Sequence, residues 1–316
     1  MRKVLRFIVL AAVLTFVCCT EKDTTIGDDQ EQTSPEDDDE DDPEDNEDTE
    51  SFWDDIEWPI TGDAFPDPVF RAYVFDRIDI DKDRKISEEE AFNVKRIYVP
   101  ATGLARKIKS LAGLEYFPNL ISLECQFNYL TSLDVSKNPN LKYLYCDFNQ
   151  LTSLDFSKNP ELEYLDCYYN QLTSLDFSKN PKLNSLSCYC NQLTNLDVSK
   201  NPELLVLECQ LNQLTSLDVS KNPKLSGLQC HSNQLTSLDV TKNPELSVLD
   251  CAANQLTSLD VSKNNLGKYS TDYPLRCAGM LSLQTLTLKR GWSIYGINVY
   301  RSTSHIPSHT DILYVD

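Results

Sequence analysis

Basic residues are scarce in this 316-residue sequence: 29 Lys and Arg stand against 49 Asp and Glu, for a net charge of −20. That balance disfavours DNA and RNA as partners, because phosphate binding needs clustered Lys and Arg. Histidine is also rare, with three residues, and the sequence has no HExxH, GxSxG or phosphate-loop motif. We therefore expect no enzymatic activity, with a hydrolytic enzyme as a remote alternative.

The sequence also lacks an apolar run long enough to cross a bilayer. Its N-terminal run ends at Val17 after 11 residues, whereas a spanning helix needs about 20. Basic residues precede the run, so residues 1–19 are predicted to be a secretory signal. The cysteine pair that follows resembles a bacterial lipobox, with Cys19 as the lipidated residue. Lipidation of Cys18 and an ordinary cleaved signal are the alternatives.

Acidic charge is concentrated in one segment after this signal. From Glu21 to Glu50 the chain has 17 acidic residues and one basic residue. Such a segment cannot bury a core and extends by self-repulsion, so residues 20–57 are predicted to be a disordered tether. A cation-binding acidic tail is the alternative. Acidic residues directly after the cysteine resemble the export tags of Bacteroidota lipoproteins, which implies an outer-membrane lipoprotein displayed at the cell surface.

Between Leu120 and Asn265 the sequence repeats every 21 residues. The period is marked by cysteines at Cys125, Cys146, Cys167, Cys188, Cys209, Cys230 and Cys251. One unit reads LxxLxCxxNxLxxLDVSKNPx, which resembles the leucine-rich repeat with Cys at its third apolar position. The resemblance implies a right-handed, horseshoe-like solenoid of stacked coils with a parallel β-sheet on its concave face.

The constant residues of the repeat are predicted to build the scaffold. Leu123, Cys125 and their equivalents should point inward, while each repeat Asn should bond turn backbone that would otherwise be buried and unpaired. The cysteines then act as small apolar residues, although a disulfide ladder or a column for a soft metal is an alternative. Asp134 and its equivalents should serve turns and pair with Lys, with a calcium ladder as the alternative.

Outward positions of the strands vary from coil to coil, and stacking does not dictate them. Tyrosine and aspartate gather there in the second to fourth coils. The predicted ligand-binding residues are Tyr143, Tyr145, Asp147, Tyr164, Asp166, Tyr168 and Tyr189. Rigid rings beside carboxylates suit a protein with a basic residue or a glycan stacked on the rings. Neutral variation on an exposed sheet is the alternative.

The segment DIDKDRKISEEE, ahead of the repeats, resembles the calcium loop of an EF-hand. The matching positions are Asp79, Asp81, Asp83, Lys85 through its carbonyl, Ser87 and Glu90. Asp67 is the expected N-cap of a helix before the loop. Arg84 replaces the usual Gly, which predicts weak Ca²⁺ binding of about 10⁻⁴ to 10⁻³ M with a structural role. An acidic loop without calcium is the alternative.

These features divide the chain into an N-terminal cap at 58–93, a degenerate repeat at 94–119, seven repeats at 120–265 and a β-rich C-terminal cap at 266–316. The arrangement resembles internalin-like leucine-rich repeat surface lipoproteins. It implies a monomeric, surface-anchored binding or adhesion module for a protein or glycan, with membrane contact only through the N-terminal lipid. A structural envelope spacer or assembly partner without its own ligand is the alternative.

Overall fold

The computed structural model describes residues 64–101, 107–266, 275–277, 279–280, 282–289 and 310–315. All of them belong to one compact unit, Glu47–Asp316. The predicted signal, tether and lipidation residues Cys18 and Cys19 lie outside the described residues. No helix within the described residues is both long and apolar enough to cross a membrane.

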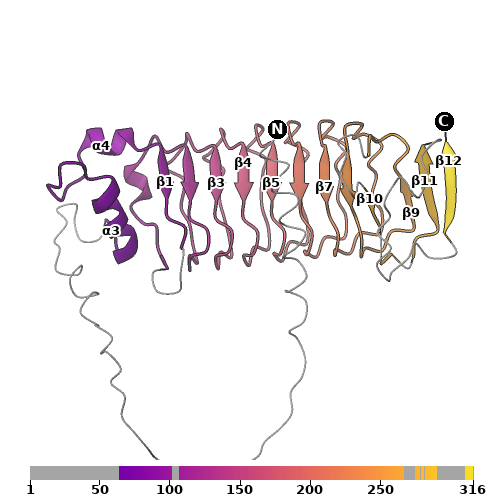
Figure 1. The fold of residues 1–316 in the computed structure, drawn as a ribbon, viewed down its shortest axis with the longest axis horizontal. Helices are drawn as coiled ribbons and strands as arrows, with labels where there is room; N and C mark the ends of the chain where they lie inside the picture. Colours follow the sequence, from indigo (N-terminus) through magenta and orange to yellow (C-terminus); the bar gives the residue numbers. More distant parts are fainter. Residues whose placement is uncertain are drawn as a thin grey trace, which may run out of the picture. The chain divides into compact units, whose positions relative to one another are not determined.

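A parallel sheet of nine short strands runs along the described chain, as Figure 1 shows. In sheet order the strands are β1 (Arg96–Tyr98), β2 (Ser122–Glu124), β3 (Tyr143–Tyr145), β4 (Tyr164–Asp166), β5 (Ser185–Ser187), β6 (Val206–Glu208), β7 (Gly227–Gln229), β8 (Val248–Asp250) and β10 (Leu275–Arg276). From β2 to β8 each residue pairs with the residue 21 positions later, as in Leu123 with Leu144. Each repeat therefore adds one coil and one strand, which confirms the predicted solenoid.

The coils bury the constant apolar residues of the repeat. In the fourth coil, Leu186 at the centre of β5 and Cys188 just after it are fully buried, and so are Leu193 and Val198 on the return path. Equivalent residues of neighbouring coils stack on them, because successive strands lie roughly 4.8 Å apart. Since one coil alone buries too little to offset the entropy of ordering it, this stacking is what stabilises the fold.

One asparagine per coil ties the turn after the strand to the preceding coil. The Asn212 amide nitrogen donates to the carbonyls of Cys188 and Cys209, each at 3.1 Å, and its Oδ1 accepts from Leu193 N–H at 3.0 Å. The equivalent bonds recur at Asn149, Asn170, Asn191, Asn233 and Asn254. The predicted role of this asparagine is confirmed.

A second asparagine column joins consecutive coils on the return path through its amide nitrogens. Fully buried Asn222 donates to the carbonyls of Val198 at 3.0 Å and Asn201 at 2.8 Å, and so joins consecutive coils. Beside it, exposed Asp218 accepts from Ser220 N–H at 2.8 Å, and this bond lowers the pKa of the Asp218 carboxyl. The aspartate column thus serves turns, as predicted.

Two helices lie ahead of the degenerate repeat and form the N-terminal cap: α3 (Pro68–Arg77) and α4 (Glu88–Asn93). Asp67 is the N-cap of α3, as expected, and accepts from Val69 and Phe70 N–H. Its second oxygen accepts from Lys109 N–H at 2.7 Å, which joins the cap to the degenerate repeat. That repeat contains β1 and the short 3₁₀ helix η1 (Leu114–Tyr116). It is longer than the others, as the pairing of Ile97 with Leu123, 26 rather than 21 residues later, shows.

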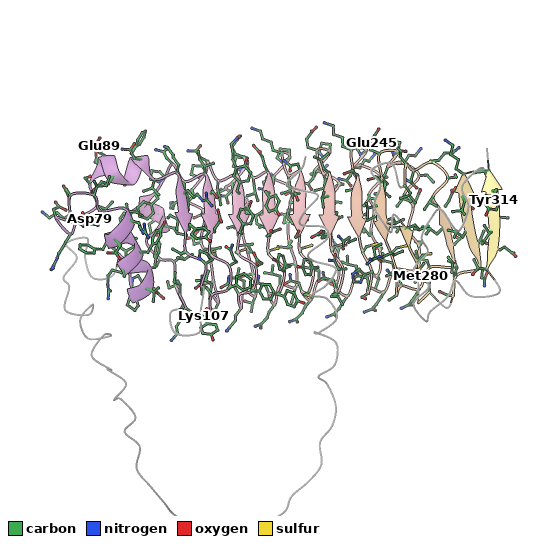
Figure 2. The ribbon with its side chains drawn as sticks, viewed as in Figure 1. Asp79, Glu89, Lys107, Glu245, Met280 and Tyr314 are labelled. Atoms are coloured by element: carbon green, nitrogen blue, oxygen red, sulfur yellow. The ribbon has the colours of Figure 1, made fainter. Side chains whose placement is uncertain are left out.

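The C-terminal segment divides between two sheets. Strand β10 extends the long sheet beyond β8, whereas β9 (Ser258–Asp260), β11 (Thr285–Lys289) and β12 (Asp311–Val315) form a separate parallel sheet in the order β12-β11-β9. Figure 2 shows Tyr314 of β12 at the opposite end from Asp79 of the helical cap. The β-rich C-terminal cap expected from the sequence is present in the described residues.

Replacing Asn212 with Ala should destabilise the solenoid by about 1–3 kcal/mol, because it leaves the buried Leu193 N–H without a partner. It also removes one of the two asparagine donors from the Cys188 and Cys209 carbonyls, which keep Asn191 and Asn233. Urea unfolding followed by circular dichroism measures this. The matched control is Gln213→Ala, at the adjacent exposed position, which should change the free energy of unfolding by less than about 0.5 kcal/mol. Equal effects of the two substitutions would contradict the assigned role of the asparagine column.

Candidate functional site

The predicted binding residues lie together on the outward face of the nine-stranded sheet (the sheet face). Strand register places Tyr143 beside Tyr164, and Tyr145 beside Asp166. The residue between them, Leu144, is fully buried, so its neighbours on the strand point to the opposite side. Asp147, Tyr168 and Tyr189 follow the ends of their strands and continue the same stacking. The structure thus brings all seven predicted residues onto one surface.

The tyrosines of this surface pack against one another. Tyr145 and Tyr164 have ring centroids 4.9 Å apart, and Tyr168 and Tyr189 stack at 4.3 Å with 9° between their planes. Burial is the main cause that raises the pKa of Tyr145 to about 12, so the phenols are neutral at physiological pH. Because each ring is held by its neighbour, the surface offers rigid rings whose side-chain entropy is already reduced before a partner binds.

A neighbouring aromatic column was not predicted from the sequence. Phe127, Phe148 and Tyr169 directly precede the repeat asparagine in three consecutive coils, and their rings stack at 4.6 and 4.5 Å. Phe148 also meets Tyr168 edge-on at 5.5 Å, so this column extends the tyrosine surface. The sequence signal was an aromatic residue before Asn in three successive repeats.

The residues of this column have left-handed backbone conformations. Phe127, Phe148 and Tyr169 have φ of 63°, 51° and 50°, and the equivalent residue of every later coil also has a positive φ. This conformation costs a non-glycine residue about 1 kcal/mol. It is maintained at each coil because the asparagine that follows must turn inward to bond the backbone.

Three carboxylates lie buried among these rings: Asp147, Asp166 and Glu208 (the central acids), each less than a tenth exposed. Asp166 Oδ2 accepts from the Tyr164 hydroxyl at 3.0 Å. Glu208 accepts from the Ser187 hydroxyl at 2.9 Å and from the Gln229 amide at 3.0 Å. These three carboxylates are therefore largely excluded from solvent, although they lie at outward positions of the sheet.

Burial shifts the protonation of the central acids. It raises the pKa of Asp147 to about 6, against an opposing hydrogen bond from the Tyr168 hydroxyl. Burial, and then the charge of Asp147, raise the pKa of Asp166 to about 8. Burial also raises the pKa of Glu208. Desolvation without a countercharge favours the neutral carboxyl, so the unliganded face holds protons near neutral pH.

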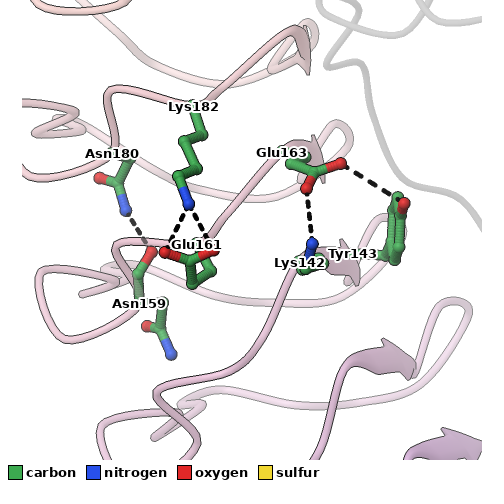
Figure 3. Close-up of polar contacts among 7 residues, drawn as sticks. All are labelled: Lys142, Tyr143, Asn159, Glu161, Glu163, Asn180 and Lys182. Carbon is green, nitrogen blue, oxygen red and sulfur yellow. Dashed lines mark hydrogen bonds and ion pairs between the residues drawn. The ribbon is translucent and has the colours of Figure 1, made fainter.

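Ion pairs surround this surface without reaching the central acids. In Figure 3, Lys142 contacts Glu163 at 2.9 Å, and Glu163 also accepts from the Tyr143 hydroxyl at 3.4 Å. Figure 3 also shows Lys182 paired with Glu161, which lies 21 residues earlier on the adjacent coil. Such exposed pairs contribute about 0–1 kcal/mol each, and they lie between coils at positions flanking the sheet.

The cap loop brings together part of the predicted calcium ligand set. Asp79, Asp81 and Asp83 place one carboxylate oxygen each within 4.8 Å of the others. Asp79 is fully buried, and its Oδ1 has no hydrogen-bond partner. Arg84 has φ of 65°, the conformation that Gly usually provides at this position, and its N–H donates to Asp79 Oδ2 at 3.0 Å. The donor set, anionic oxygens with one buried oxygen unpaired, fits a hard cation.

The other predicted ligands have hydrogen-bond partners within the chain. Glu90 accepts from Ile80 N–H at 2.6 Å and from Ser87 N–H at 2.9 Å. Burial alone would raise the pKa of Glu90, but these hydrogen bonds hold it below its usual value. Ser87 forms a capping box with Glu90 at the start of α4. Lys85 N–H donates to Asp83 at 2.8 Å, which leaves the Lys85 carbonyl as the group expected to reach an ion.

The thiols of the cysteine column are unreactive by environment. All seven, Cys125 to Cys251, are fully buried and free. Burial raises their pKa well above the usual value; for Cys209 it rises to about 12. Among the described cysteines, which also include Cys190 and Cys277, none forms a disulfide. This column acts as apolar packing, as the sequence analysis favoured.

Comparison with known proteins agrees with this architecture. A family model described as leucine-rich repeats (2 copies) matches residues 106–159 and 160–201. The functional domain of InlJ from Listeria monocytogenes, which includes a cysteine ladder, is 30% identical over 80% of this chain, with a TM-score of 0.56. This chain spans 60% of that domain's length. Curated proteins give no match.

A second solved structure shows the shared fold. Internalin C2 from Listeria monocytogenes is 21% identical over 68% of this chain and 94% of its own, with a TM-score of 0.56. The chain is thus a leucine-rich repeat solenoid similar to internalins.

Replacing Asp166 with Asn should stabilise the protein by roughly 1–3 kcal/mol at pH 8.5, since one pKa unit corresponds to about 1.4 kcal/mol. The pKa of Asp166 rises from 3.8 to about 8 on folding. At pH values between these two, the folded chain holds a proton on Asp166 that the unfolded chain releases. Stability therefore falls as pH rises through this range. The gain should shrink at pH 5, as measured by urea unfolding at both pH values.

The matched control is Asp250→Asn on the same row of the sheet. Asp250 lies 3.5 Å from Arg276, so its charge is already balanced and its removal should bring no gain at pH 8.5. A destabilised Asp166→Asn protein at pH 8.5 would show that the carboxylate is stabilised by a group not identified above.

Proposed function

We propose that this chain is a binding module and that the tyrosine-rich part of its sheet face, over β3 to β5, recognises a partner protein. The observation that carries this proposal is the contrast within each coil. The scaffold positions repeat nearly unchanged, whereas the sheet face carries stacked rings and buried carboxylates that the stacking of coils does not require. Buried carboxylates without a countercharge cost stability, and a surface that retains them is better explained by recognition than by support.

The similarity to internalins supports a role in protein interaction rather than catalysis. A glycan stacked on the same rings is a second possible ligand, since tyrosine faces suit sugar rings as well as side chains. A spacer without a ligand predicts that changes to the sheet face have no effect on binding. Array binding of a tyrosine variant distinguishes a protein ligand, a glycan ligand and a spacer without a ligand.

A triple substitution of Tyr145, Tyr164 and Tyr168 with Ala should abolish binding to the partner, because it removes most of the rigid ring surface. Soluble protein from residues 20–316 would be screened on arrays of cell-surface proteins and glycans. The matched control replaces Tyr129 and Tyr314, two exposed tyrosines outside the predicted binding residues, and should keep every interaction. Folding of both variants is checked by thermal melting.

Protein hits lost only in the triple variant support the proposal. Hits that persist in the triple variant would move recognition off the sheet face. Exclusive binding to glycans would replace the protein partner with a sugar, and the absence of hits would favour the spacer.

We further propose that the module is exported and held at the outer membrane by a lipid on Cys19, with the acidic residues 20–57 as its tether. The support is the sequence alone: a signal-like run, a cysteine directly after it and a segment too charged to fold. Surface display would expose the sheet face to other cells or to matrix, where a monomeric binding module can meet its partner.

We also propose that the cap loop binds calcium in a structural role. The specific support is Asp79 Oδ1, a buried anionic oxygen without a hydrogen-bond partner, beside Asp81 and Asp83. Burial raises the pKa of Asp79, so a divalent cation there would offset the cost of holding the carboxylate ionised. Glu90 would have to turn from the loop backbone to the ion, which agrees with weak affinity.

Calcium at about 10 mM should stabilise the protein by 1–3 kcal/mol, which corresponds to roughly 10 to 100 times the expected dissociation constant. Arg84→Gly should bind calcium about tenfold more tightly, because it removes a positive charge near the ion and a strained left-handed conformation. Asp79→Asn should abolish the effect, measured as the calcium-dependent rise in melting temperature.

Asp134→Asn is the matched control for the calcium experiment. Its carboxylate also accepts from the backbone two residues later, in an exposed turn of the solenoid, and it should leave the calcium response unchanged. A response that survives Asp79→Asn would place the ion elsewhere.

A further inference from the structure

One row of the sheet face alternates acids with neutral residues. Its members, in order from β2 to β8, are Glu124, Tyr145, Asp166, Ser187, Glu208, Gln229 and Asp250. Carboxylates occupy every second strand, so neighbouring acids of the row are separated by roughly 9–10 Å. Two of the three residues between them, Ser187 and Gln229, donate hydrogen bonds to Glu208.

The two ends of this row are neutralised and its middle is not. Glu124 pairs with Arg96 of β1, and Asp250 pairs with Arg276 of β10. For Asp166 and Glu208, and for Asp147 beside them, the described part of the chain provides no ion pair with Lys, Arg or His. A buried carboxylate normally has a cation or several donors, so the centre of the sheet face lacks a positive charge.

Two buried polar groups in this region also lack partners. Asp166 Oδ1 is buried and accepts no hydrogen bond. The single Ser187 hydroxyl proton goes to Glu208 at 2.9 Å, which leaves the Tyr164 hydroxyl as the donor to Asp166, at its other oxygen. Gln210 is fully buried, and neither its amide oxygen nor its amide nitrogen is hydrogen bonded. The site is therefore built to accept donors that the described chain does not supply.

We propose that the central acids bind an arginine side chain of the partner protein, seated over Asp166 between the Tyr145–Tyr164 pair and the Tyr168–Tyr189 pair. This inference rests on the proposed function of the sheet face and names the group that it recognises. Since Asp166 Oδ1 is buried in the unliganded chain, the covering rings would have to part for the guanidinium to donate to it. The charge of the guanidinium would then favour the ionised form of Asp147, Asp166 and Glu208.

Arginine fits this site better than lysine or a sugar. A guanidinium is planar, carries five donors and stacks on aromatic faces, and the site combines separated acceptors with ring walls. An ammonium concentrates its charge at one point and is more strongly hydrated. A sugar hydroxyl needs acceptors and donors alike, but the Tyr164 and Ser187 hydroxyl protons already bond carboxylates.

The experiment uses protein from residues 20–316 and the peptide Gly-Gly-Arg-Gly-Gly, titrated at pH 7.5 and followed by tyrosine ring NMR signals. The matched peptide carries citrulline, which keeps the shape of arginine without its charge. We expect saturable shifts of the sheet-face tyrosines with the arginine peptide, and affinity about tenfold weaker with citrulline, because hydrogen bonds between charged groups are the stronger ones.

Asp166→Asn should weaken the arginine peptide about tenfold, whereas Asp250→Asn should leave its affinity unchanged because Asp250 is already paired. Loss of folding would not explain this result, since Asp166→Asn is expected to be the more stable protein at this pH. Equal binding of the citrulline peptide, or unchanged binding by Asp166→Asn, would overturn the arginine site. Stronger binding of the neutral sugar maltotriose than of the arginine peptide would also overturn the arginine site.

The failures of the two proposals can be told apart. Array partners that are lost in the triple tyrosine variant but persist in Asp166→Asn would retain the sheet face as the binding surface and overturn the arginine site. The opposite result is arginine peptide binding that depends on Asp166, with array partners that bind the triple tyrosine variant as well as the unchanged protein. It would support the arginine site and overturn the sheet face as the binding surface for those partners.

Discussion

The need to hydrogen bond backbone inside the coils is the constraint on which this structure depends. Every coil turns sharply after its strand, so carbonyl and N–H groups are buried where no strand can pair them, and an unpaired buried group costs about 1–3 kcal/mol. Asn212 and its equivalents meet this need with four bonds each, two of them to the preceding coil. Because the bonds join equivalent positions, every coil has to bring its turn to the same place on the preceding coil. Asn128 makes the same contacts across the longer degenerate repeat, where it donates to Val99 O at 2.8 Å.

That spacing also decides what the sheet face can carry. In-register stacking places each outward side chain beside the residue 21 positions away, so identical acids on adjacent coils would repel, while aromatic rings would stack. The row from Glu124 to Asp250 agrees with this rule, because acids alternate with Tyr, Ser or Gln. The aromatic rings, in contrast, run through consecutive coils, as Phe127, Phe148 and Tyr169 do. The chemistry of the face is thus shaped by the geometry of the scaffold.

The regular features could be predicted from the sequence because each depends on periodicity. The inward leucine and cysteine, the outward rows and the role of the repeat asparagine all follow from a period of two within the strand and 21 between strands. The burial of Asp166 could not be predicted, because it depends on how the tyrosine rings lie over it. The separate sheet formed by β9, β11 and β12 was also missed, since Thr285–Lys289 reads as a strand without indicating its partner.

The caps explain why the uncompensated charge is at the centre of the face. Arg96 lies in β1, within the degenerate repeat, and pairs with Glu124. Arg276 lies in β10, the last strand of the long sheet, and pairs with Asp250. The coils of Glu124 and Asp250 each have an irregular coil on one side, with β1 or β10, and that irregular coil supplies the cation. A central coil has a regular repeat on both sides, and at this row those repeats provide Tyr145, Ser187 and Gln229 rather than Lys or Arg. Within the described residues no cation pairs with Asp166 or Glu208, so their countercharge would come from a bound partner that displaces the half-buried rings of Tyr145, Tyr164 and Tyr168.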